Sequence, residues 1–235
     1  NIQNMKKLVL LSFALVFGLM TFAQEKFEEG KIKMTQKMTT DNEQMKAMLK
    51  QMMGEEGMQI TMYIKGDKSR VEMNNPMSGD MTFIAHSDER KSLMLMDNPY
   101  MGKKYTLTNV SEEEMDELEE NVVIEEGTEV KTILGYECKE HIVTVSQDGA
   151  EVKMKMFITD KIAPVMTQQT AMLGDKLKGF PMYMVIDMNQ QGVEMTVTAE
   201  VTELSKEEVP DGKFSLTPPE GYSEMQVPQG QLQKN

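Results

Sequence analysis

Few of the residue types that build active sites or cross-linked folds occur in this chain. Its 235 residues include one Cys, two His and no Trp. A single Cys excludes an internal disulfide framework, and two His leave little material for general acid–base or zinc chemistry. Basic side chains are also outnumbered, with 25 Lys and Arg against 38 Asp and Glu and a net charge of -13. This acidity argues against binding to nucleic acid, or to anionic lipid, through charge.

Motifs for covalent or phosphate chemistry are also absent. The sequence has no Gly-x-Ser-x-Gly elbow and no phosphate-cradling glycine loop. Cys138 and His141 lie three residues apart in an expected strand, so they point to opposite faces and cannot form a nucleophile–base pair. The acidic runs are typical of solvated surface. An enzyme is therefore the least favoured class, and the sequence predicts no cofactor and no metal site.

The residues that follow Met5 predict where the protein is located. Two lysines precede an apolar run from Leu8 to Phe22, which is followed by Ala23. A basic start, a short apolar middle and a small residue are typical of a secretory signal peptide. The run of about 15 residues is shorter than the roughly 20 that a membrane-spanning helix needs. We expect residues 1–23 to be a signal peptide with a short upstream extension, and the mature chain to be periplasmic or secreted, without a transmembrane segment.

Alternation of apolar and polar residues is the strongest signal in the rest of the chain. It runs through residues 58–65, 151–158, 182–188 and 193–202, with shorter stretches between them. A period of two is typical of strands with one buried face. Turn residues such as Gly66 and Asp67 separate these stretches. Many strands with short turns favour antiparallel pairing, with one apolar and one polar face.

Three short helical segments are expected. Asp41 is predicted to cap a helix that ends at Met53. Ser111 is predicted to cap a shorter one that ends at Glu120. A third is expected between Pro164 and Lys178. A one-sided sheet with so little helix must curve to cover its apolar face. We therefore predict a mainly β (α+β) fold: a curved antiparallel sheet, or open half-barrel, wrapped around a few short helices.

Several segments resemble a known family; they are Gly30–Met34, Met62–Arg70, Thr132–Lys139, Lys178–Met182 and Phe214–Tyr222. The chain resembles a domain-of-unknown-function family of exported bacterial envelope proteins, related to the LolA/LolB lipoprotein-carrier superfamily. The resemblance implies a curved sheet with a cavity that in the carriers holds acyl chains. It carries over no functional residue, and the carriers' cavity arginine cannot be aligned here. We expect a single LolA-like domain over residues 24–222 and a disordered tail over 223–235.

Methionine is the residue type in large excess, at 26 of 235 residues. Met94 and Met96, Met154 and Met156, and Met182 and Met184 each place two sulfurs on one strand face. Three interpretations stay open. The methionines could replace Ile, Leu and Val in an ordinary core, form an adaptable apolar binding surface, or provide soft ligands for Cu(I).

We favour the binding surface: a non-enzymatic protein whose concave, Met-lined face holds an acyl chain, a lipoprotein or another apolar ligand. The predicted wall residues are Met34, Ile60, Met62, Met154, Met156, Met182, Met184 and Met195. One alternative is a structural or interaction protein whose concave face is filled by its own chain. The other is a Met-based Cu(I) or oxidant buffer, since Met sulfoxide forms reversibly. A lipid or apolar ligand and another envelope protein are the expected partners.

Overall fold

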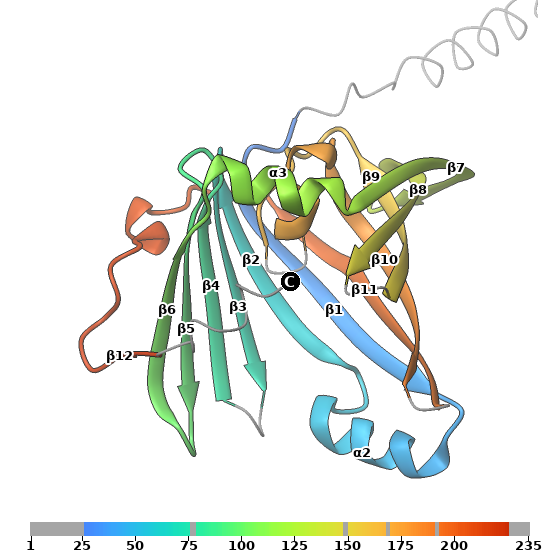
Figure 1. Ribbon diagram of the computed structural model, residues 1–235, viewed down its shortest axis with the longest axis horizontal. Coiled ribbons are helices and arrows are strands. Elements are labelled where there is room, and N and C mark those ends of the chain that lie inside the picture. Colours follow the sequence, from blue (N-terminus) through green and yellow to red (C-terminus); the bar gives the residue numbers. More distant parts are fainter. Residues whose placement is uncertain (1–25, 76–78, 148–149, 168–169, 191–192, 226–235) are drawn as a thin grey trace, which may run out of the picture.

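The computed structural model describes residues 26–75, 79–147, 150–167, 170–190 and 193–225. The predicted signal peptide lies outside the described residues. Within them, twelve strands form one sheet (Figure 1). The strands are β1 (Glu29–Thr40), β2 (Met58–Lys65), β3 (Lys68–Asn75), β4 (Gly79–His86), β5 (Lys91–Asn98), β6 (Gly102–Asn109), β7 (Val122–Ile133), β8 (Tyr136–Gln147), β9 (Ala150–Thr159), β10 (Phe180–Gln190), β11 (Val193–Ser205) and β12 (Ser223–Glu224). The helices are α2 (Glu43–Met53), α3 (Glu112–Glu120) and the 3-10 segments η1 (Ala171–Lys176) and η2 (Asp211–Phe214).

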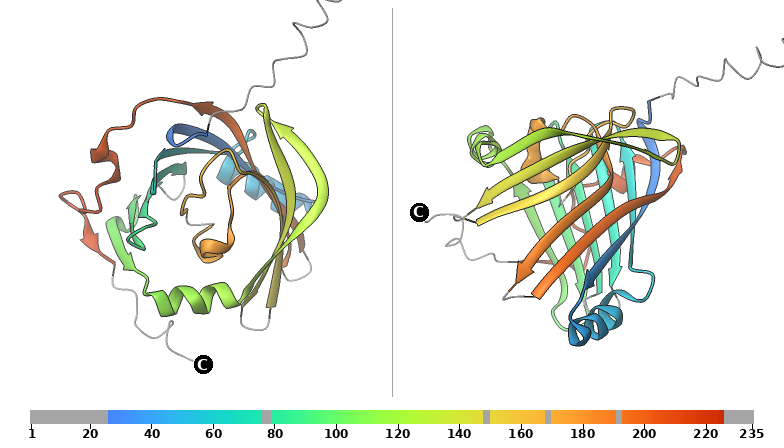
Figure 2. Two further views of the ribbon diagram at one scale, coloured as in Figure 1. Left: turned by 90° about the horizontal axis from the view of Figure 1, so that it is seen from above. Right: turned by 90° about the vertical axis from the view of Figure 1, so that its right-hand side faces the viewer.

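The sheet is built from two antiparallel meanders that meet at the first strand. β1 to β6 follow one another on one side, and β11 back to β7 follow on the other, because β11 pairs with β1. The short β12 adds to β6 in parallel. Seen from above, the sheet curls around an internal segment of the chain (Figure 2). The predicted fold class is therefore confirmed: a curved, mainly antiparallel sheet with few short helices.

Residues 160–167 and 170–179, which we call the plug, lie inside the upper part of the curved sheet (Figure 2). Ile162 and Leu173 are fully buried against it. The Ser69 hydroxyl of β3 donates to the Met166 carbonyl at 2.5 Å, which ties the plug to the sheet. The helix expected between Pro164 and Lys178 is reduced to η1, which is itself kinked at Gly174. Packing into the concavity, rather than helix periodicity, determines the path of this segment.

The two α-helices begin at side-chain caps. The cap of α2 is Asn42 and not Asp41 as predicted, since the Asn42 side chain accepts from the Met45 backbone N–H. At α3 the predicted capping box of Ser111 and Glu114 is present in both directions. Among the described residues, no helix combines the length and apolar character that crossing a bilayer requires.

Residues 206–225, which we call the strap, cross the convex face of β2 to β6 (Figure 2). Phe214 of the strap packs with Ile84 and Leu93 in a second, smaller core. The His86 Nε2 atom lies 2.8 Å from the Phe214 carbonyl oxygen. The strap ends in β12, so the disordered tail that we predicted from residue 223 is wrong in its first residues. Residues 226–235 of that tail lie outside the described ranges.

Candidate methionine-lined binding site

The eight predicted wall residues share the concave side of the sheet and are buried. Each is at most 8% exposed, and Met156 and Met182 are fully buried. Seven of them belong to the main core with the plug; the eighth, Met195, is buried separately. The structure therefore brings seven of the eight together as packing partners. Any contact of theirs with a ligand would require the plug or its surroundings to move.

A different set of methionines on the same concave face remains half-buried. Met73 of β3, Met81 of β4, and Met94 and Met96 of β5 form what we call the methionine face. They lie on the concave side because Met73 and Met94 pack against the main core. Met81 and Met96 share that side, since side chains two residues apart on a strand point the same way. The strap covers the opposite side of these strands.

The strand register aligns three of these residues in a row. Met73 is directly opposite Met81, and Met81 is directly opposite Met96. On the inner side the row continues to Ile60, which is buried in the core. The row therefore runs from closed core to half-open surface. Met94 and Met96 were predictable as a pair from the sequence, whereas β3 and β4 contain one methionine each. The alignment of Met73 and Met81 with them depends on the pairing of separate strands, which is not visible in sequence.

A polar border closes the methionine face at β6. Lys104 lies opposite Met96, and its ammonium group donates to the Ser223 hydroxyl at 3.0 Å. Thr106 lies opposite Met94, and its buried hydroxyl oxygen has no hydrogen-bond partner within the described structure. An apolar surface with a few polar groups at its edge is typical of sites for amphiphilic ligands.

A second apolar recess lies where α2 meets the end of β1. Its volume is about 390 Å³, and its walls include Met38, Leu49 and Met53. Leu49 is the buried residue of α2, and Met48 on the same helix is 52% exposed. Lys46 is paired with Glu43 at 2.7 Å. The volume falls within the range of about 300–1,000 Å³ that is usual for ligand pockets.

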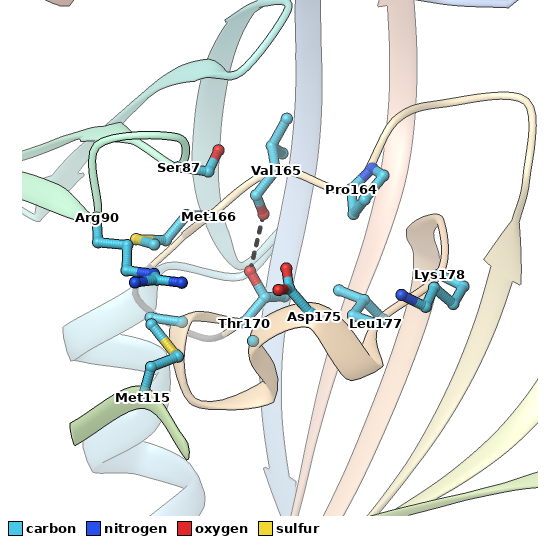
Figure 3. Close-up of a pocket in the computed structure, with 12 residues that line it drawn as sticks. Ser87, Arg90, Met115, Pro164, Val165, Met166, Thr170, Asp175, Leu177 and Lys178 are labelled. Atoms are coloured by element: carbon cyan, nitrogen blue, oxygen red, sulfur yellow. Dashed lines mark hydrogen bonds between the residues drawn. The ribbon is translucent and has the colours of Figure 1, made fainter. Parts of the chain in front are cut away.

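A third, smaller pocket of about 180 Å³ lies between the plug, α3 and the turn after β4 (Figure 3). Arg90 reaches into it near Met115 and Thr170, and the Thr170 hydroxyl donates to the Val165 carbonyl at 3.0 Å. The Arg90 backbone has a positive φ of 52°, and its carbonyl accepts from the Val110 N–H at 3.0 Å. The pocket is too small for more than a compact group.

The residues considered for catalysis are held in other contacts. Cys138 is fully buried, and burial raises the pKa of its thiol to about 11. The His141 Nδ1 atom lies 3.1 Å from the Lys139 carbonyl oxygen. In the described part of the chain, no group of three or more His, Cys, Asp or Glu side chains is arranged to hold a metal ion. The buried Glu140 carboxylate accepts from Lys155 at 2.7 Å and from the Thr128 and Glu129 N–H groups, so its role is structural.

One family model, described as a domain of unknown function (DUF4412), matches residues 27–222. The chain belongs to this family. The predicted membership in a family of unknown function is thereby confirmed, whereas the relation to LolA and LolB stays a prediction. No curated protein matches.

Two solved structures are weakly similar to the chain. That of PNGF-II has 14% identity and a TM-score of 0.46, and the match covers 83% of this chain. The chain spans only 31% of the length of PNGF-II. The lipoprotein LppX of Mycobacterium tuberculosis has 8% identity and a TM-score of 0.33 over 77% of this chain and 89% of its own. Both scores are too low to support a functional comparison.

Proposed function

We propose that this chain is a non-enzymatic binding protein of the bacterial envelope that holds an acyl chain or a similar apolar ligand on its methionine face. The observation that carries the proposal is the row Met73, Met81 and Met96. These side chains are in register on the concave face, next to the main core, and stay half-buried. Apolar side chains that a folded protein leaves partly accessible next to one another commonly mark a binding surface.

Methionine suits this role for a physical reason. Its unbranched thioether side chain has three rotatable bonds and is polarizable, so it adapts to ligands of irregular shape. The rigid sheet beneath supplies the fixed part of the site, because the strap packs behind the same strands through Leu93 and Leu95. A flexible lining on a rigid support is expected to accept a range of apolar chains.

The recess under α2 extends the proposal to a second contact area. Met38 at its wall is paired with Val197 of β11, so it shares the concave side of the sheet with the methionine face. α2 lies at the lower end of the sheet, where β3 and β5 also end (Figure 1). We propose that Met38, Leu49 and Met53 hold another part of a long chain.

A neutral dye that fluoresces in apolar surroundings, N-phenylnaphthylamine, tests the binding site. In a variant with Met81→Asp and Met96→Asp, each carboxylate would have to be desolvated by the bound dye. We expect at least a tenfold loss of dye affinity, equivalent to about 1.4 kcal/mol. The matched control carries Met48→Asp and Met101→Asp, which change residues that are 52% and 57% exposed elsewhere.

The control variant should bind dye within about twofold of the unchanged protein, since surface changes away from a site are usually near-neutral. Circular dichroism must show the same strand content in all three proteins. Absence of dye uptake by the unchanged protein, or an equal loss in both variants, would contradict the proposal. If the dye results support the proposal, native mass spectrometry of protein purified from its own envelope would identify the natural ligand by its extra mass.

The second candidate is a structural or interaction protein with a self-filled concavity, and one observation favours it. Seven of the eight predicted wall residues, among them Met156 and Met182, are already buried in one core that includes apolar side chains of the plug. An envelope protein would be its partner. Absence of any bound lipid together with absence of dye uptake would favour this candidate over the first.

Export is the remaining part of the proposal. The signal peptide predicted over residues 1–23 would direct the chain to the periplasm or outside the cell. Mature protein is therefore expected to begin at Gln24 and to fractionate with periplasmic or secreted material. N-terminal sequencing of the fractionated protein tests this, and an intact Met5 in a membrane fraction would contradict it.

A further inference from the structure

The methionine row has a chemical property that apolar binding does not use. Met73, Met81 and Met96 each end in a thioether, and they come from three neighbouring strands. Residues directly opposite on antiparallel strands have Cβ atoms about 4.5–5.5 Å apart. Met81 therefore lies between two thioether side chains that can each swing toward it.

The strand geometry brings the outer pair within reach as well. Strands two apart in a sheet are separated by about 9–10 Å. Each sulfur lies two bonds beyond its Cβ atom, so a methionine side chain can cover part of this separation. Side chains on the concave face of a curved sheet also converge, because they point toward the centre of its curvature. Three sulfurs from one row can therefore converge on a point above Met81. Met94, two residues before Met96 on the same strand face, is a diagonal neighbour of Met81, and such neighbours are within reach of long side chains.

Three neutral thioethers select a particular kind of ion. Thioether sulfur is a soft ligand that favours Cu(I), whereas Mg²⁺ and Ca²⁺ require oxygen and Zn²⁺ prefers thiolate, imidazole or carboxylate. No carboxylate shares the row: on the inner side it continues to Ile60, and on the outer side to Lys104, whose ammonium group is bonded to Ser223. A low-charge soft cation fits this surface better than a divalent ion.

Two core methionines on the concave face are aligned in the same way but are not accessible. Met156 and Met184 are also directly opposite each other, but they are 0% and 5% exposed under the plug. An ion could not reach their sulfurs without opening the core. The row at Met73, Met81 and Met96 combines alignment with access, and this combination distinguishes it from the core methionines.

We infer that Met73, Met81 and Met96 form a binding site for a soft monovalent metal ion, Cu(I), with Met94 as an additional donor. The site is independent of apolar-ligand binding in its chemistry, although it uses the same surface. Replacing Met by Leu keeps the size and apolar character of the side chain but removes the sulfur. This substitution therefore separates the metal site from the apolar site.

The test is an anaerobic titration of the full mature chain with Cu(I) in competition with bathocuproine disulfonate. The unchanged protein should withdraw one equivalent of Cu(I) from the chelator. The variant carrying Met73→Leu, Met81→Leu and Met96→Leu should lose that equivalent while still taking up N-phenylnaphthylamine. A control with Met48→Leu, Met101→Leu and Met172→Leu changes three methionines that are exposed outside the row and should retain it.

Ag(I), a soft monovalent ion that needs no reductant, should bind to the unchanged protein and to the control but not to the triple variant. Zn²⁺ should not bind to any of them. If the triple variant does not fold, Met81→Leu alone must weaken Cu(I) binding at least tenfold. Failure of the unchanged protein to withdraw Cu(I), retention of the equivalent by the triple variant, or equal loss in the control would overturn the site. Dye uptake without Cu(I) binding would overturn the metal site and leave the proposed function standing.

Discussion

Replacing Met156 and Met81 by Ala, one at a time, tests whether the concave face is divided into closed core and open surface. Met156 is fully buried between His141 of β8 and Met184 of β10. Met81 is half-buried, with Met73 and Met96 on its two sides. The two substitutions delete the same atoms from two separate parts of one sheet face, one on β9 and one on β4. Any difference between them therefore reports the surroundings.

The expected magnitudes follow from burial. Truncating a fully buried Met to Ala costs about 2–5 kcal/mol, and the plug leaves little room for the site to collapse, so Met156→Ala should lower the free energy of unfolding by about 3 kcal/mol. Met81→Ala removes a side chain that water already reaches in part. Its cost should be about 1 kcal/mol or less.

Equilibrium unfolding in urea, followed by circular dichroism, measures both values. The denaturant slope should be unchanged, which shows that the two states compared are the same. Lys153→Ala serves as the reference for an exposed residue and should cost at most about 0.5 kcal/mol. Lys155 is unsuitable as that reference because it pairs with the buried Glu140 at 2.7 Å. Equal losses at Met156 and Met81 would refute the division of the face.

Three further outcomes follow from single residues. Cys138 should not react with thiol reagents at pH 8 until the protein unfolds, because its pKa is raised to about 11; rapid labelling of the native state would contradict this burial. The Lys155 ammonium beside Glu140 holds the pKa of that carboxyl below its usual 4.5. Glu140→Gln should therefore lower the melting temperature by a constant amount above pH 5, and the difference should shrink as the pH falls below about 4.5; a difference that grows toward acid would have the wrong sign. Gly30→Ala places a Cβ atom 2.2 Å from the Ser205 carbonyl oxygen and should lower the free energy of unfolding by about 3 kcal/mol or more. Gly66 has a φ of 59° and open space around it, so Gly66→Ala should lower it by only about 1 kcal/mol. Similar values for the two variants would contradict the close approach at Gly30.

Local sequence patterns were sufficient for most of the strands and for one helix start. Alternation over residues 193–202 corresponds to β11, with Met195 and Val197 buried and Glu200 exposed. The capping box at Ser111 was also predictable, because both of its hydrogen bonds join residues three apart. Such features depend on neighbours within the chain, and the sequence displays those directly.

Alternation predicted the buried side chains less well where other parts of the chain cover both faces of a strand. Leu93 and Leu95 alternate with Met94, which predicts one buried and one exposed side. The structure buries the two leucines on the convex face, because the strap packs Val209 and Phe214 there. More than a hundred residues separate the strap from these strands, and no local pattern records that distance.

The same limit applies to the candidate site. By itself the sequence determined that methionines line one face of an antiparallel sheet, because side chains alternate along each strand. Which methionines stay accessible was decided only by the tertiary structure. The plug closes over Met156 and Met182 and leaves Met81 half-buried, and the register of β3 to β5 sets Met73 and Met96 on either side of it. Burial and cross-strand alignment both depend on contacts between segments far apart in the chain, so they exist only once the chain has folded.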